Sequence, residues 1–190
     1  MAAAEAIVEF PDPSVSSPIW CGWKSEGIRE FSAEYVVETD FRGFRFRKSV
    51  AESAVCEPFN IPCEVRADAR YRVTMNTYVE NGVQRHYAQV ECNDEVVGRV
   101  QMLDKNRDAY TAEGGVRLFV RGSSYATCRI LSFRVWDYYS SPNFKADYVP
   151  ALQLSDGAVG YYDFVSKTFK AVDKKFGSFD EILGDNPPQE

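Results

Sequence analysis

The sequence predicts an all-β protein, an antiparallel sandwich of two sheets, on three observations. Short segments in which apolar and polar residues alternate recur along the chain, with turn residues between them. Apolar residues with helical spacing are almost absent. The 190 residues include 45% hydrophobic and 14% aromatic residues, which is enough for the sizeable core of one domain.

The clearest strand is predicted over residues 71–79, where alternation is strict. Side chains of a half-buried strand alternate between core and water. The core-facing set is Tyr71, Val73, Met75, Thr77 and Val79, and the opposite set is Arg72, Thr74, Asn76 and Tyr78. Alternation also runs through residues 31–37. In the next strand, residues 44–47, we expect Phe44 and Phe46 in the core and Arg45 and Arg47 in solvent.

Turn residues indicate how these strands connect. Asn81-Gly82 favours a type I′ turn, which needs positive φ at both central residues, and leads into a strand over 83–92. Asn93-Asp94 offers a second tight turn into residues 95–103. Residues 70–103 are therefore predicted to form a three-stranded antiparallel meander.

The C-terminal half continues the pattern after a polar loop over residues 104–115. Asp156-Gly157 predicts a hairpin turn, and residues 179–183 a short amphipathic turn. The further strands are expected at 116–121, 128–137, 145–154, 158–164 and 168–172. Residues 1–183 are thus predicted to form one domain, followed by a Pro-rich, acidic tail, 184–190, that is disordered or a linker.

Charge and hydropathy exclude some classes of partner. Acidic residues outnumber basic ones by 28 to 22, a net charge of −6, which argues against nucleic acid as a partner. No apolar stretch approaches the roughly 20 residues that a membrane helix needs, so we expect no membrane insertion. Arg42–Lys48 superficially resembles an RNA-recognition strand, but the helices of that module are missing around it.

Five cysteines, an odd number, cannot all pair within the chain. Cys56 and Cys63 flank a loop short enough for one bridge to close. The alternative is that most of the five are small buried hydrophobic residues, which is the interpretation that we favour.

Three segments of the C-terminal third resemble a known family. They are Arg117–Val120 with Cys128–Val135, then Asp147–Ala151, then Asp156–Val165 with Thr168-Phe169. Their order and spacing are similar to those of the concanavalin-A-like, laminin-G-like jelly rolls of bacterial and phage proteins. The resemblance implies a jelly-roll sandwich that serves as a binding or adhesion module on secreted or cell-surface proteins. Ala171–Lys174 departs from the family pattern after the last strand.

Individual residues of the matched segments have structural explanations. Gly157 suits the turn, and Gly160 a bulge or a close approach of two backbones. Asp163 is expected to accept a hydrogen bond from the chain just beyond its strand.

A ligand site is predicted on the strand over 128–137. If Leu131, Phe133 and Val135 face the core, Arg134 and Trp136 share the opposite face. Aromatic side chains form flat platforms for the apolar faces of sugar rings, and polar neighbours fix the orientation of the ligand. The predicted ligand-contacting residues are Arg134, Trp136, Tyr138 and Tyr139. The alternative is that Trp136 packs under a neighbouring loop.

A calcium site is a second hypothesis. Asp104, Asn106 and Asp108 place oxygen ligands at alternate positions, as at the start of a calcium loop. Ala109 and Gly115 then break the motif, although Glu113 offers a substitute carboxylate. A solvated hairpin loop explains the same residues without a metal.

The sequence does not predict an enzyme. Glycan-cleaving enzymes need two facing carboxylates, and we find no pair on one predicted strand face, since Glu91 and Asp94 flank a turn and Asp180-Glu181 lies in the tail. The single histidine, His86, lacks the neighbours of a triad or a zinc site. The prediction is a non-catalytic module that binds carbohydrate or a cell-surface glycan. The alternatives are a structural or protein-interaction domain of a surface or phage appendage and, third, a glycan-cleaving enzyme.

Overall fold

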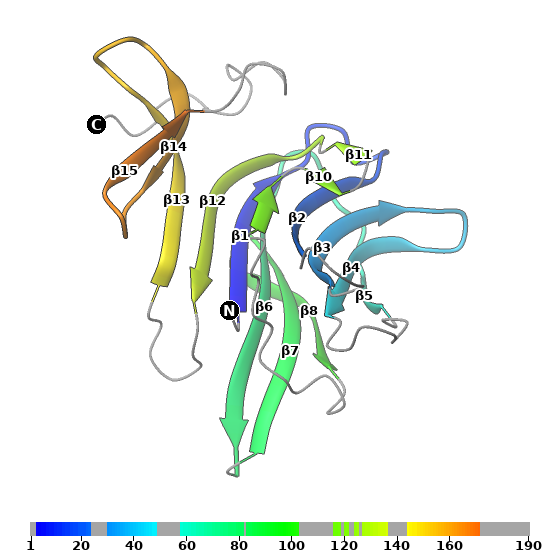
Figure 1. Cartoon of the computed structure of the whole chain (residues 1–190). Coiled ribbons are helices and arrows are strands. Elements are labelled where there is room, and N and C mark those ends of the chain that lie inside the picture. The colour runs from blue at the N-terminus through cyan, green and yellow to red at the C-terminus, as the bar shows by residue number, and fades with distance from the viewer. Residues whose placement is uncertain are drawn as a thin grey trace.

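The computed structural model is all-β, which confirms the predicted fold class (Figure 1). It describes residues 3–23, 30–48, 58–81, 83–102, 116–118, 120–121, 124–125, 127–136 and 144–171. Within these ranges the chain forms strands and turns but no helix. The described residues therefore contain no helix that is long and apolar enough to cross a membrane. The predicted turn at 179–183 and the tail at 184–190 lie outside the described residues.

The larger sheet has eight antiparallel strands in the order β15-β14-β13-β12-β1-β6-β7-β8. Near its middle lies β1 (Ala3–Glu9), between β12 and β6. One half consists of β6 (Arg70–Glu80), β7 (Val83–Cys92) and β8 (Glu95–Met102). The other half consists of β12 (Arg129–Trp136), β13 (Phe144–Leu152), β14 (Val159–Asp163) and β15 (Thr168–Ala171).

The smaller sheet has five strands in the order β5-β4-β3-β2-β9. These are β2 (Ser17–Trp23), β3 (Glu30–Val37), β4 (Arg42–Lys48), β5 (Phe59–Pro62) and β9 (Val116–Leu118). The strands β10 (Val120–Arg121) and β11 (Ser124–Tyr125) pair only with each other, as a separate two-stranded antiparallel sheet among the described residues. In Figure 1, β2–β5 lie to one side of β1 and β6, whereas β13–β15 extend away on the other side.

The predicted meander is confirmed, since β6, β7 and β8 pair consecutively. Asn93 and Asp94 have φ of 49° and 67°, the positive pair that a type I′ turn requires. Asn81 at the first hairpin also has a positive φ, 52°. The segment predicted as one strand over 116–121 is instead divided into β9 and β10, which pair with different partners.

Aromatic rings from both sheets meet in the core. Phe10, which directly follows β1, lies 5.0 Å from Tyr35 of β3 and 6.0 Å from Tyr71 of β6, between ring centroids. Phe44 of β4 lies 5.6 Å from Tyr35 and 5.7 Å from Tyr71. All four rings are fully buried, and tilted or edge-on arrangements of this kind are the favourable ones. This four-ring cluster joins the two sheets.

A second contact joins the sheets beside β12. Trp20 of β2 lies 5.8 Å from Phe133 of β12, between ring centroids. The buried hydroxyl oxygen of Ser17 accepts hydrogen bonds from the amides of Thr127 and Cys128, at 3.0 and 3.1 Å. The start of β12 is therefore tied to β2 by polar as well as apolar contacts.

The prediction for the inner face of β12 was wrong at one position. Phe133 and Val135 belong to the core as expected, but Ile130, rather than Leu131, joins them there. The pairing with β1 explains the difference, because Ile7 pairs with Ser132 and Val8 with Ile130, so Leu131 is the extra residue of a β-bulge. A bulge reverses the alternation, and periodicity alone does not reveal it.

Three expectations from the C-terminal motif are confirmed. A Cβ at Gly160 would lie 2.2 Å from the carbonyl oxygen of Lys170 on β15, a close approach of two backbones. Asp163 Oδ1 accepts from the amides of Asp147 and Val165, at 2.9 and 3.1 Å, and its Oδ2 accepts from the Ser166 hydroxyl at 2.7 Å. Gly157 has a positive φ of 70° in the predicted turn.

We predict that Phe44→Ala lowers the free energy of unfolding by about 3–5 kcal/mol, because it leaves a cavity in the four-ring cluster. Phe164→Ala is the matched control, since Phe164 is 45% exposed, and it should change stability by less than about 1 kcal/mol. Urea unfolding followed by tryptophan fluorescence measures both. Equal losses for the two variants would contradict the assignment of the cluster as the intersheet contact.

Asp163→Asn is predicted to destabilise the fold in a pH-dependent way. Burial alone would raise the pKa of the Asp163 carboxyl, but hydrogen bonds from Asp147, Ser166 and Val165 outweigh it and lower the pKa. A lowered pKa in the folded state adds stability above the unfolded pKa of about 3.9, and that contribution is lost as pH falls through the folded value. The wild type should therefore exceed Asp163→Asn by about 1–3 kcal/mol at pH 7. The difference should narrow below about pH 4; a pH-independent difference would contradict this account.

Candidate binding face

Arg134 lies on the outer face of the larger sheet, between two carboxylates from neighbouring strands. The strand pairing sets Arg134 of β12 opposite Glu5 of β1 on one side and Asp147 of β13 on the other. The Nε of Arg134 donates to Asp147 Oδ1 at 3.0 Å, and its Nη1 lies 3.9 Å from Glu5 Oε1. The Arg134 side chain is 41% exposed, against 18% for Glu5 and 16% for Asp147. The two acids thus hold a guanidinium that still faces water.

One aromatic ring lies against this guanidinium, and a second packs on that ring. The Arg134 guanidinium carbon lies 5.6 Å from the centroid of the Phe144 ring, in the range of a cation–π contact. Trp136 meets Phe144 edge-on, with ring centroids 6.0 Å apart and an interplanar angle of 86°. Polar and apolar groups therefore lie side by side at this end of the sheet.

A polar row continues from Glu5 across the sheet. The Thr74 hydroxyl of β6 donates to Glu5 Oε2 at 3.3 Å. Strand pairing then places Thr74 opposite Gln89 of β7, and Gln89 opposite Arg99 of β8. With Asp147 and Arg134, these residues form a row across six adjacent strands, from β13 to β8. We call it the polar row, and its members are Asp147, Arg134, Glu5, Thr74, Gln89 and Arg99.

Residues next to the polar row hold its Gln89 and Arg99 end in place. Gln89 Nε2 donates to Glu91 Oε1 at 2.6 Å, and Arg72 Nη1 donates to Glu91 Oε2 at 2.8 Å. The Arg99 guanidinium carbon lies 3.9 Å from the centroid of the Tyr87 ring. Asp147, Arg134, Glu5 and Thr74 are therefore held by contacts with one another, whereas Gln89 and Arg99 are held by Glu91 and Tyr87 outside the row.

The structure places the predicted ligand residues as follows. Arg134 and Trp136 share the outer face, as predicted, and both contact Phe144. Trp136 is only 7% exposed, so its ring is packed against neighbours and is not an open platform. Tyr138 and Tyr139 lie outside the described residues, as do Asp104, Asn106 and Asp108 of the calcium hypothesis. In the described ranges, no group of three or more His, Cys, Asp or Glu side chains could hold a metal ion.

Glu5 and Asp147 form a pair of acids that the sequence did not reveal. Two acids on one strand can be recognised from their spacing, whereas these two come from β1 and β13 and flank β12. The sequence did contain one indication of this pair, because Glu5 and Asp147 each occupy an outward-facing position in a strand with alternating side chains. The side chain of Arg134 lies between the two carboxylates, 3.9 Å from Glu5 and 3.0 Å from Asp147.

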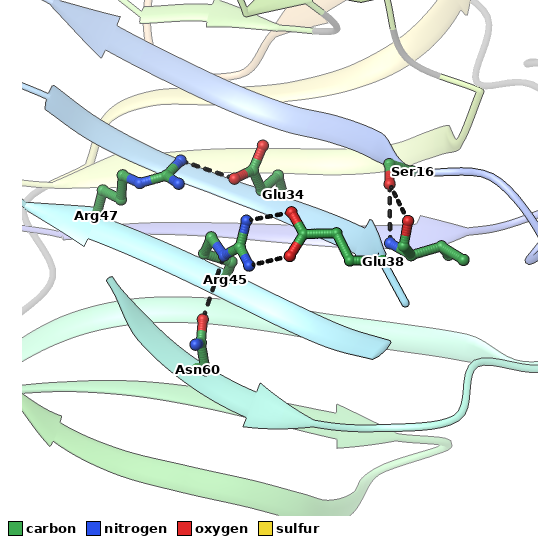
Figure 2. Close-up of polar contacts among 7 residues, drawn as sticks. Ser16, Glu34, Glu38, Arg45, Arg47 and Asn60 are labelled. Carbon is green, nitrogen blue, oxygen red and sulfur yellow. Dashed lines mark hydrogen bonds and ion pairs between the residues drawn. The ribbon is translucent and has the colours of Figure 1, made fainter. Parts of the chain in front are cut away.

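The outer face of the smaller sheet carries a different set of charges (Figure 2). Phe44 and Phe46 are buried, as predicted. Arg45 and Arg47 were wrongly expected in solvent, since their side chains are only 15% and 17% exposed. Neighbouring acids explain the difference: both terminal nitrogens of Arg45 bind Glu38, at 2.8 and 2.7 Å, and Arg47 Nη1 binds Glu34 at 2.7 Å.

The bond with Arg45 is strong enough to lower the pKa of the Glu38 carboxyl. Arg45 Nε also donates to the Asn60 side-chain oxygen at 3.4 Å, and the guanidinium carbon lies 5.5 Å from the Phe41 ring centroid. Each cation here is largely covered by its partners. The more exposed guanidinium of Arg134 makes the outer face of the larger sheet the better candidate for a ligand.

The chain was compared with family models, curated proteins and solved structures, and none of the three comparisons gave a match.

We predict that Trp136→Ala lowers the free energy of unfolding by about 3 kcal/mol, because Trp136 is buried against Phe144. Trp136→Phe is the conservative control and should lose less, since it keeps an aromatic ring in the same place. Chemical denaturation of both variants measures the difference. Unchanged stability in Trp136→Ala would contradict the packing role and favour a role in ligand contact.

Proposed function

We propose that this chain is a non-catalytic module that binds carbohydrate on the outer face of its larger sheet, around Arg134. The observation that carries the proposal is the exposed guanidinium that Glu5 and Asp147 hold in place. Sugar hydroxyls both donate and accept hydrogen bonds, so they suit a surface on which donors and acceptors alternate. In the polar row, Arg134 offers donors and its two neighbours offer acceptors.

Preorganisation supports the same proposal. A flexible arginine loses side-chain entropy when it binds a ligand, whereas one already held by two carboxylates loses less. Phe144, which is only partly buried and is backed by the buried Trp136, supplies apolar surface beside Arg134, and the nonpolar face of a pyranose ring packs well against such surface.

Local charge favours an uncharged glycan over an acidic one. Two carboxylates, Glu5 and Asp147, flank the single guanidinium of Arg134, so this part of the face has a formal charge of −1. The whole chain carries −6. A uronate or sulfate group would be repelled by this local negative charge and by that of the whole chain, whereas a neutral sugar would not.

The non-catalytic assignment is supported by the position of Arg134 between the only pair of acids that spans β12 on this described face. The concanavalin-A-like jelly-roll relationship, and with it a secreted or cell-surface location, belongs to the same proposal. It is supported by the Asp156-Gly157 turn, the close approach at Gly160 and the hydrogen bonds of Asp163.

A structural or protein-interaction domain is the second candidate. Phe164 and Val165, at the turn between β14 and β15, are 45% and 44% exposed, and Leu154 in the preceding turn is 60% exposed. The edge strand β15 also has one side without a neighbouring strand in the described sheet. Exposed apolar turns beside an open sheet edge are typical of surfaces that contact other proteins.

The test is a screen of neutral and acidic glycans against the wild type, Arg134→Ala and Arg70→Ala. Arg70 is the matched control, because it also binds an acid of β1, Glu9, at 2.9 Å on the outer face. We expect neutral glycans to bind the wild type and Arg70→Ala. Arg134→Ala should lose about 10- to 100-fold in affinity, the cost of a charged hydrogen bond.

Each other result points to a different conclusion. No binding to any glycan would contradict the proposal and leave the protein-interaction candidate. Binding that Arg134→Ala leaves unchanged would place the site elsewhere. The screen is run with calcium and again with a chelator, and binding lost on chelation would direct attention to Asp104, Asn106 and Asp108.

A further inference from the structure

Two cysteines from different sheets approach each other at one end of the core. Cys63 directly follows β5 of the smaller sheet, and Cys92 is the last residue of β7 of the larger sheet. Both are partly buried, both pack against the core, and neither is in a disulfide.

A contact between the two sheets lies near both cysteines along the chain. A Cβ on Gly98 of β8 would lie 2.5 Å from the Ile61 side chain of β5, so β5 lies directly against β8. Gly98 pairs with Val90 of β7. Cys63 is two residues beyond Ile61, directly after β5, and Cys92 is two residues beyond Val90 on β7.

Tyr71 and Arg66 connect the two positions. Tyr71 pairs with Cys92 across β6 and β7, and the amide of Arg66, three residues after Cys63, donates to the Tyr71 hydroxyl at 2.9 Å. The Arg66 side chain returns to the other cysteine, with Nη2 3.9 Å from Cys92 Sγ. The short connection after Cys63 is therefore fixed to the end of β7. The two thiols are also close enough that Cys92 contributes, after burial, to the raised pKa of Cys63.

We propose that Cys63 and Cys92 form a disulfide that joins the two sheets when the protein meets a small-molecule disulfide oxidant. The thiolate of one cysteine attacks the oxidant, which releases one small thiol and leaves a mixed disulfide. The thiolate of the other cysteine then attacks the protein sulfur and releases the second small thiol. Two protein thiols are oxidised to one disulfide, and one oxidant disulfide is reduced to two thiols.

The chemistry also predicts how this reaction depends on pH. Burial raises the pKa of the Cys63 thiol to about 11, so only a small fraction of it is thiolate at neutral pH. Attack by the Cys63 sulfur is therefore slow at neutral pH, and ring closure should accelerate as pH rises from 7 to 9.

The alternative partner for Cys63 is Cys56, which lies outside the described residues. The two pairings have different consequences. A bridge between Cys56 and Cys63 closes a short local loop, whereas one between Cys63 and Cys92 links β5 to β7 and constrains both sheets.

The test is to treat the full chain with oxidised glutathione, block the remaining thiols by alkylation, digest the protein and identify the linked peptides by mass spectrometry. We expect a Cys63–Cys92 link in the wild type and in Cys56→Ser, and none in Cys63→Ser or Cys92→Ser. Cys21→Ser is the control for loss of a buried thiol at a different place, and it should keep the link.

A second measurement is the thermal midpoint before and after oxidation. In Cys56→Ser the link should raise Tm by about 5–10 °C, and a reductant should reverse the rise. Neither change should occur in Cys92→Ser. A Cys56–Cys63 link in the wild type, or glutathione on Cys92 that never resolves into a link at pH 9, would overturn the proposal.

Discussion

The packing of aromatic rings between the two sheets is the contact on which the rest of the structure depends. Tyr71 belongs to the larger sheet, and Phe10 directly follows its strand β1. Tyr35 and Phe44 belong to the smaller sheet. Burial of large rings gives a small all-β domain much of its stability, and their tilted packing fixes how the sheets lie on each other. Because these rings occupy the inner faces, the polar side chains of each strand are directed outward.

The arginines on the outer faces of the two sheets differ in how far their partners cover them. On the smaller sheet, Arg45 and Arg47 are largely covered by the acids that bind them. On the larger sheet, two well-covered acids support one exposed arginine, Arg134. Surface ion pairs contribute little stability, and the role that we propose for the arrangement around Arg134 is ligand contact. Asp163 also helps to position Asp147 beside Arg134, since Asp163 Oδ1 accepts a hydrogen bond from the amide of Asp147.

Sequence alternation was sufficient to predict much of this architecture. The meander of β6, β7 and β8 and its type I′ turn follow from local residue preferences, because turn residues and period two act over short distances. The bulge at Leu131 could not be predicted, since it is set by the pairing of β12 with β1, more than a hundred residues away in sequence. For the same reason only part of the candidate face around Arg134 could be predicted. Arg134 was identified from its own strand, but Glu5 and Asp147 are brought to it by strand order.

The most direct test of a ligand face around Arg134 is to titrate a neutral glycan identified by screening into ¹⁵N-labelled protein and follow the backbone amide resonances. We predict that the perturbed resonances cluster on β1, β12 and β13, centred on Glu5, Arg134 and Asp147. The outer face of the smaller sheet, around Arg45 and Arg47, should remain unchanged. Perturbations confined to the smaller sheet, or to the turns at the ends of the sandwich, would contradict the account.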